Sequence, residues 1–204
     1  MENILSNKAI IAQFYKQVVG KRDTTLIYLL VREDYIQHSP AGKDGRAALI
    51  EMIAFLKTLP PSTETQSPVK MIIEEGDMVA GLLDIKFMGK RMLVIDLFRL
   101  QNGMLAEHWD AVQEVGDDFV LDKIVADDAE DVNASKAFVA ARPGMNAKRI
   151  IGEGDVVVTQ SAIAEDGKSF ASYDIFKVVN GTIANHYSIK QAAPDVMMHD
   201  NGMI

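Results

Sequence analysis

The chain has 204 residues, of which 48% are hydrophobic and 25% are charged, the balance of an ordinary folded protein. Its 21 basic and 29 acidic residues give a net charge of −8, which repels phosphate groups, so neither nucleic acid nor an anionic membrane is expected as a partner. Without cysteine, the chain has no disulfide, thiolate nucleophile or cysteine-bound metal. The N-terminal segment lacks an uninterrupted apolar core, and no apolar run approaches the roughly 20 residues of a membrane-spanning helix. These features predict a soluble, cytoplasmic protein.

The first third of the chain has the pattern of helices. Apolar residues at helical spacing predict three of them, over 7–19, 25–31 and 46–59. Ser6 and Asp44 are the expected N-caps of the first and third helices, and Pro60-Pro61 is expected to stop the third. The segment 33–38 is expected to lead out of the second helix into a turn.

The rest of the chain is mostly strand-like. Apolar runs separated by glycine-containing turns predict a first antiparallel meander, with strands over 69–75, 78–87, 91–100 and 104–115. A helix is expected over 131–141, followed by a second meander over 148–191. Residues 192–204 are expected to form a surface tail, in which His199 has no partner motif.

Two stretches of the sequence resemble each other at a constant separation of 78 residues. Residues 96–109 read DLFRLQNGMLAEHW, and residues 174–187 read DIFKVVNGTIANHY. The same separation relates Gln113 to Gln191. Shared strand propensity does not explain so many identities in one register, and we interpret the pattern as a duplicated β-rich unit. The second unit has only a short segment before its first strand, so most of its helical layer is missing.

Helices followed by a curved antiparallel sheet indicate an α+β fold. Several short motifs then support a family resemblance. They are Phe14-Tyr15, the run Tyr35-Ile36-Gln37-His38-Ser39-Pro40, Gly45-Arg46, Glu75-Gly76-Asp77, Asp96-Leu97-Phe98-Arg99 and Glu107-His108-Trp109-Asp110. In this order and spacing they resemble a SnoaL-like domain, the polyketide-cyclase branch of the nuclear transport factor 2-like superfamily.

The resemblance implies a cone of helices packed on a curved sheet over residues 1–116. It also implies a partial, sheet-rich second copy over residues 117–204, packed on the first. Domains of this superfamily commonly pair through their sheets. The second copy is therefore expected to occupy part of that surface, and a homodimer is expected to use what remains.

Polar side chains converge on the hairpin of residues 96–110. Alternation along a strand places His108 and Asp110 on one face and Trp109 on the other. A three-residue loop at 101–103 would set Asp96 opposite His108, whereas a two-residue loop would set it opposite Trp109. We favour the three-residue loop, because it groups three polar residues suited to proton transfer.

The resemblance implies that Asp110 acts as general acid and base, with His108 and Asp96 as its polar support and with no cofactor or metal. Tyr15, Tyr35 or His38 could contact the substrate and donate to a developing oxyanion. Tyr15 fits core packing equally well, and His38 could instead stabilise its turn.

The second copy gives a structural alternative for the pair of Asp96 and His108. Both residues recur, as Asp174 and His186, so the pair could be a structural strand contact. Asp110 is replaced by Ser188, which leaves at most one competent site, in the first half.

A metal could be held by His38, His108, Asp96 and Asp110, but no close-spaced ligand motif is present and none is expected. The sequence therefore predicts proton abstraction beside a carbonyl of a small apolar ligand, in a cyclisation or an isomerisation. The alternative is a non-catalytic ligand-binding or assembly module of the same fold.

Overall fold

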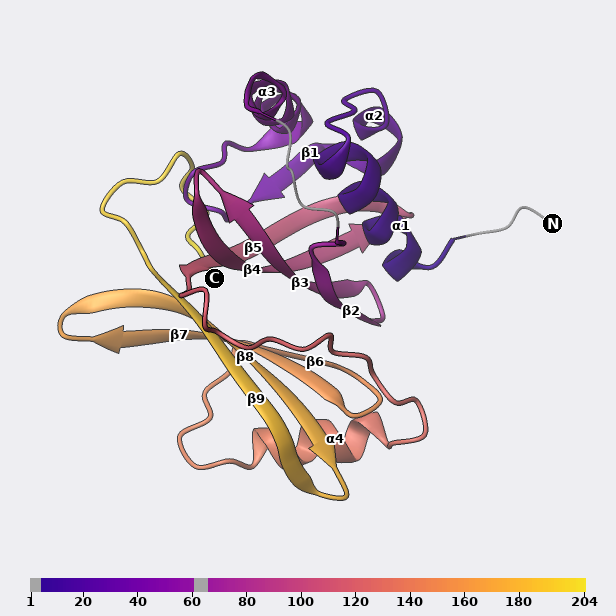
Figure 1. The fold of residues 1–204 in the computed structure, drawn as a ribbon, viewed down its shortest axis with the longest axis vertical. Coiled ribbons are helices and arrows are strands. Elements are labelled where there is room, and N and C mark those ends of the chain that lie inside the picture. The colour runs from indigo at the N-terminus through magenta and orange to yellow at the C-terminus, as the bar shows by residue number, and fades with distance from the viewer. Residues whose placement is uncertain (1–4, 61–65) are drawn as a thin grey trace.

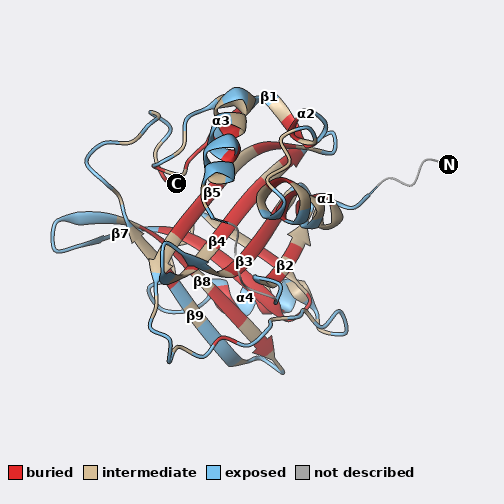
Figure 2. Cartoon of the chain, turned by 45° about the horizontal axis from the view of Figure 1, so that its top comes forward, coloured by how far each residue is buried: buried red, intermediate tan, exposed pale blue. Residues whose placement is uncertain are grey.

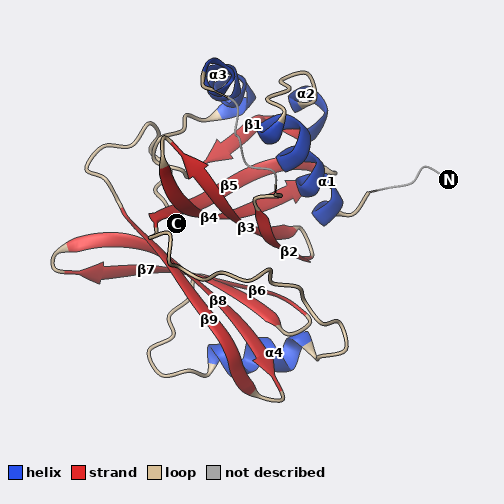
Figure 3. Ribbon diagram, in the orientation of Figure 1, coloured by secondary structure: helices blue, strands red, loops and turns tan. Residues whose placement is uncertain are grey.

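The computed structural model describes residues 5–60 and 66–204 and arranges them in four layers (Figures 1 and 3). Helices cover one face of a first sheet, a second sheet packs on the opposite face, and one helix covers the outer side of the second sheet. The helices are α1 (Asn7–Gln13), its π-helical continuation η1 (Phe14–Gly20), α2 (Ile27–Leu30), α3 (Gly45–Thr58) and α4 (Val132–Ala140). The expected α+β class, with a second sheet-rich part, is confirmed.

The strands form two separate sheets. The first has the order β1-β5-β4-β3-β2, with strands Val31–Gln37, Met104–Glu114, Lys90–Gln101, Met78–Phe87 and Val69–Glu75. The second has the order β6-β7-β8-β9, with strands Arg149–Glu153, Val156–Glu165, Lys168–Val179 and Thr182–Ala192. Of the expected segments, residues 1–4 and Pro61 lie outside the described residues.

The N-termini of α1 and α3 test the two predicted N-caps. Ser6 caps α1 as expected, because its hydroxyl accepts from the backbone N–H of Ala9. Asp44 stands at the N-cap position of α3, but its carboxylate accepts from the Gln37 N–H instead of from the helix. Asp44 therefore ties the end of β1 to the start of α3.

Strand β1 is a correction to the sequence prediction, which treated residues 33–38 as a lead-out from a helix. The segment pairs in parallel with β5 at the edge of the first sheet. Its central residues, Arg32 to Asp34, are partly or fully exposed, as is usual at a sheet edge, so the apolar alternation of a strand is weak there.

The second sheet repeats the first in detail. Strands β7, β8 and β9 begin and end 78 residues after β3, β4 and β5. Both last hairpins turn at an Asn-Gly pair with positive φ, at Asn102-Gly103 and Asn180-Gly181. Both hairpins also break register at the same place, after Arg99 and after Lys177. The sequence repeat is thus a repeat of strand bounds, turns and register.

The two sheets pack through equivalent faces and bury the largest apolar cluster of the molecule (Figure 2). Residues 78 apart belong to the same cluster, among them Ile95 and Tyr173, and Ala111 and Ile189. Burial of apolar area contributes about 25 cal/mol per Å², so this layer is a main source of stability.

Reciprocal hydrogen bonds cross the edges of this layer. The Gln113 side chain accepts from the Lys190 N–H, and the Gln191 side chain accepts from the Val112 N–H, at 2.9 and 2.7 Å. Two glutamates repeat this exchange between the sheets. The Glu75 carboxylate accepts from the Gly152 N–H, and the Glu153 carboxylate accepts from the Glu74 N–H.

The glutamates also form matching ion pairs. Lys8 of α1 pairs with Glu153, and Lys136 of α4 pairs with Glu75. Such mutual contacts are characteristic of an interface between two like units. They also show that α4 holds, on the second sheet, the place that α1 holds on the first.

The C-terminal segment is a second correction, because it is not a surface tail. His199 bonds the Ser39 carbonyl, Asn201 bonds the Gln37 carbonyl and the Asp44 carboxylate, and Met203 is buried. The Met198 N–H donates to the Pro40 carbonyl. The end of the chain is therefore fastened over the loop between β1 and α3.

Among the described residues, no helix has the length and apolar character needed to cross a membrane.

The exchanged glutamine bonds give a stability prediction. Gln191→Ala leaves the Val112 N–H without its acceptor and should lower the free energy of unfolding by about 1 kcal/mol, and Gln113→Ala should do the same for the Lys190 N–H. Urea unfolding measures both. Gln101→Ala, at an exposed hairpin tip, is the control and should leave the midpoint unchanged. Midpoints equal to the wild type in both interface variants would contradict this account.

Candidate functional site

The hairpin of β4 and β5 positions the candidate site by a β-bulge. Leu100 pairs with Leu105 and Arg99 pairs with Glu107, so Ala106 is an extra residue on β5. The expected three-residue loop is wrong: the turn has two residues, and the bulge shifts the register beyond it. Asp96 consequently lies directly opposite Asp110, on the same face as His108, whose direct partner is Phe98.

The three polar residues meet despite the different register. The Asp96 Oδ1 and His108 Nε2 atoms are 2.9 Å apart. The other oxygen of Asp96 accepts from the hydroxyl of Tyr15, at 2.7 Å. Tyr15 reaches across β3 at Gly81, where an added Cβ would overlap its ring and hydroxyl. Gly81 therefore provides the space through which η1 contacts the site.

Gln37 fixes the protonation of His108. Its side-chain oxygen accepts from the backbone N–H groups of His38 and Ser39, which identifies this atom as the oxygen of the amide. The same oxygen lies 3.0 Å from His108 Nδ1, so Nδ1 must carry a proton. Since Nε2 faces a carboxylate, one further proton lies between His108 and Asp96. The arrangement is that of an imidazolium paired with a carboxylate.

The pKa of His108 agrees with this geometry. Burial lowers the pKa of the imidazole, but the hydrogen bond that it donates to Asp96 and the charges of Asp96 and Asp110 outweigh burial and raise it. His108 therefore keeps its positive charge to higher pH than a free histidine.

Asp110 is the carboxylate of the cluster whose pKa is raised. The side chain is buried, with 8% of the residue exposed, and its Oδ1 has no hydrogen-bond partner among the described residues. Burial raises the pKa of Asp110 to about 6; the charge of Asp96 adds to the rise, while His108, Ser39 and His199 oppose it. A carboxylate with this pKa can exchange a proton near neutral pH.

The two tyrosines line the same side of the sheet. Tyr35 is buried, and its hydroxyl accepts from the Gln37 side-chain amide, at 3.4 Å. Burial and the charges of Asp110 and Asp96 raise the pKa of Tyr35, and burial and Asp96 raise that of Tyr15. Both phenols therefore stay protonated and are hydrogen-bond donors at neutral pH.

His38 lies on the opposite face of the sheet from this cluster. Its ring stacks on Trp109, with centroids 4.7 Å apart, and it bonds Glu107 and the Gly202 carbonyl. Arg149 of the second sheet stacks on Trp109 as well, at 4.1 Å. His38 thus helps to hold the C-terminal segment and the packing between the sheets, away from Asp110.

Three residues of the cluster are of the types that bind metal ions. Asp96, His108 and Asp110 each offer a ligand atom, and these atoms lie within 4.8 Å of one another. Nε2 of His108 already faces Asp96 across a proton, so binding an ion there would require loss of that proton.

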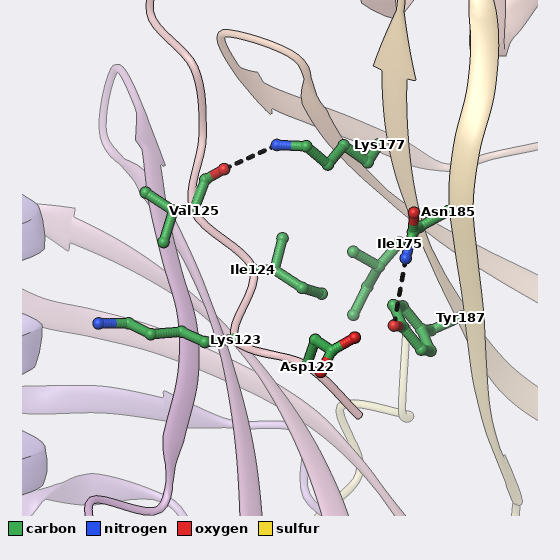
Figure 4. A pocket seen from close by; sticks show the side chains of 8 residues that line it. All are labelled: Asp122, Lys123, Ile124, Val125, Ile175, Lys177, Asn185 and Tyr187. Atoms are coloured by element: carbon green, nitrogen blue, oxygen red, sulfur yellow. Dashed lines mark hydrogen bonds between the residues drawn. The ribbon is translucent and has the colours of Figure 1, made fainter. Parts of the chain in front are cut away.

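Two cavities of similar size lie elsewhere in the molecule. One, of about 230 Å³, lies beside the segment that joins the two sheets, where Lys177 bonds the Val125 carbonyl (Figure 4). The other, of about 240 Å³, lies on the outer face of the second sheet. Asp96, His108 and Asp110 line neither of them.

Sequence reasoning missed Gln37 as a site residue. Its role depends on β1 pairing with β5, which sets Gln37 beside His108. The available signal was its place within the family-like run from Tyr35 to Pro40.

The raised pKa of Asp110 predicts a pH dependence of stability. The folded state holds this proton up to about pH 6, whereas the unfolded chain loses it near 3.8, so the carboxylate destabilises the fold increasingly between these values. Asp110→Asn should therefore raise the free energy of unfolding at pH 8 by up to ~3 kcal/mol, and by little at pH 4. Urea unfolding at several pH values measures the difference, with the exposed Asp166→Asn as the charge-matched control. A gain that is equal at pH 4 and pH 8 would disprove the assignment.

No protein-family model and no curated protein matches this chain. Among solved structures, it is similar to IdmH of Streptomyces antibioticus, a candidate polyketide cyclase, with 21% identity and a TM-score of 0.44 over 53% of this chain and 92% of the other. An NTF2-like protein of unknown function from Cytophaga hutchinsonii shows 17% identity and a TM-score of 0.47 over 55% and 95% of the two chains. A candidate ketosteroid isomerase from Kribbella flavida shows 16% identity and a TM-score of 0.44 over 59% of this chain and 90% of the other. Each of these similarities covers between 53% and 59% of this chain.

Proposed function

We propose that this protein catalyses proton abstraction beside a carbonyl of a small, largely apolar molecule, with Asp110 as the general base. One observation carries the proposal: a buried carboxylate lies beside a protonated His108–Asp96 pair, has a pKa of about 6, and has one oxygen without a partner among the described residues. Most structural carboxylates are fully hydrogen-bonded, and perturbed acids of this kind concentrate at functional sites.

The other residues support one proton transfer. The Asp110 carboxylate takes the proton from the carbon next to the carbonyl, and the electron pair of that C–H bond moves to the carbonyl oxygen to give an enolate. Tyr35 is the donor for this oxygen, because its hydroxyl hydrogen has no acceptor among the described residues. The Tyr15 hydroxyl already donates to Asp96, so Tyr15 acts as a positioning residue. Gln37 positions His108 in the same way, by accepting a hydrogen bond from its Nδ1.

The enolate then has two outcomes. In an isomerisation, Asp110 returns its proton to another carbon of the same molecule. In a cyclisation, the enolate carbon attacks an electrophilic carbon of the same molecule, and the new alkoxide takes the proton. Neither outcome needs an oxidant or a reductant.

A second function is favoured by a different observation. Neither of the two cavities is lined by Asp110, and the loop between β1 and α3 lies close to it, with Ser39 beside the carboxylate. A closed site of this kind fits a binding or assembly module in which the polar cluster fixes the fold.

Deuterium exchange separates the two functions. The protein is incubated in D2O with small cyclic ketones and β-dicarbonyl compounds, and exchange at the carbon next to the carbonyl is followed by NMR. We expect exchange whose rate rises with pH through about 6, as Asp110 ionises, and a loss of at least about 100-fold in Asp110→Asn.

Asp166→Asn is the control and should exchange at the wild-type rate. Tyr35→Phe should slow exchange while Asp110 remains able to titrate. If none of the probes exchanges above the solvent rate, or if Asp110→Asn exchanges like the wild type, the catalytic proposal fails and the binding or assembly function takes its place.

We further propose that residues 1–116 and 117–204 are two units of common origin that pair within one chain. The exchanged contacts of Gln113 with Gln191 and of Glu75 with Glu153 support this. A homodimer, if it forms, would use surfaces other than the sheet faces buried between the two units.

A further inference from the structure

A second Asp–His pair lines the cavity on the outer face of the second sheet. Asp174 Oδ1 and His186 Nε2 are 2.8 Å apart, and each lies 78 residues after Asp96 or His108. Phe176 stacks on the ring of His186, with centroids 4.4 Å apart and planes 5° from parallel. The duplicated hairpin therefore rebuilds the pair and its aromatic support.

The second pair differs from the first in what surrounds it. In the first sheet, β1 lies beside β5 and brings Gln37 to Nδ1 of the histidine. In the second sheet, β9 is the edge strand. Within the described chain, Nδ1 of His186 has no hydrogen-bond partner, and 42% of this side chain is exposed. One ring nitrogen thus remains accessible to a ligand.

A tight turn builds the wall of the cavity facing this pair. It runs from Arg142 to Met145, with Pro143 second, Gly144 third at a φ of 78°, and the Met145 N–H bonded to the Arg142 carbonyl. This is the pattern of a type II turn, which needs a glycine or asparagine at its third position. The turn fixes both the arginine and the methionine at the cavity.

The cavity has one cation that the described residues leave unpaired. Arg142 lies over the Phe176 ring, 5.4 Å from its centroid, and forms no ion pair with any described residue. Asp174 is the one carboxylate among the lining residues, and it is already paired with His186. An anion entering the cavity would therefore meet an available guanidinium.

The remaining wall sets the size and polarity of the ligand. Its apolar part is formed by Met145, Ala162, Ile163 and Phe176, and its hydroxyl and amide groups by Ser161, Ser172 and Asn146. The volume of about 240 Å³ is below the roughly 300–1,000 Å³ of pockets for drug-sized molecules.

We infer that this cavity is a second binding site, independent of Asp110, for a small carboxylate with an aromatic or branched apolar body. Arg142 binds the carboxylate through its planar fork, and Met145 and Ile163, which are partly exposed in the cavity wall, pack against the apolar body. His186 Nδ1 bonds a second polar group where the ligand has one.

Benzoate is the probe, and the full chain is titrated with it by amide NMR. We expect saturable shifts confined to residues 142–146 and to the adjacent parts of β7, β8 and β9. Benzamide, which has the same shape without the charge, should bind at least about tenfold more weakly, because it cannot pair with Arg142.

Arg142→Gln should weaken benzoate binding by at least about tenfold, and Arg142→Lys should restore part of it. Lys168→Gln, at an exposed hairpin tip, removes the same charge and should change nothing. Asp110→Asn should bind benzoate like the wild type, which separates this site from the proposed catalytic one. Absence of saturable shifts, shifts centred on β4 and β5, equal binding of benzamide, or unchanged binding in Arg142→Gln would each overturn the inference.

Discussion

The packing of the two sheets against each other is the constraint on which the rest of the structure depends. It buries one face of each sheet in a common apolar layer, and the exchanged glutamine and glutamate contacts fix the sheets in one relative position. Each sheet is left with one outward face. The first carries helices and an added edge strand, and the second carries α4. Both Asp–His pairs lie on these two outward faces.

The two faces show how surroundings change the same pair of residues. On the first, Gln37 and Tyr15 complete the hydrogen bonds of His108 and Asp96, and burial together with the charge of Asp96 raises the pKa of the Asp110 carboxylate. On the second, a serine replaces that carboxylate, and the equivalent pair lies in an accessible cavity. The two hairpins share strand bounds and register, and the unequal layers outside them give the two pairs different chemical environments.

The sequence predicted the elements and the repeat well, because both depend on local patterns. Strand alternation and Asn-Gly turns determine the meanders, and apolar spacing determines α1 and α3. The prediction failed where distant parts of the chain decide the outcome. The bulge at Ala106 has no local signature, yet it sets Asp96 opposite Asp110. Strand β1 and the C-terminal segment both depend on partners far away in the sequence. For that reason the sequence did not identify Gln37, and it did not indicate that His38 lies on the opposite face of the sheet from Asp110.

The central claim is that Asp110 is a buried acid that titrates near neutral pH. Carbon-13 NMR of the side-chain carboxyl carbons, assigned by comparison with Asp110→Asn, measures this directly. We expect a midpoint of about 6 for Asp110. A midpoint near 3.8, that of an ordinary aspartate, would contradict it.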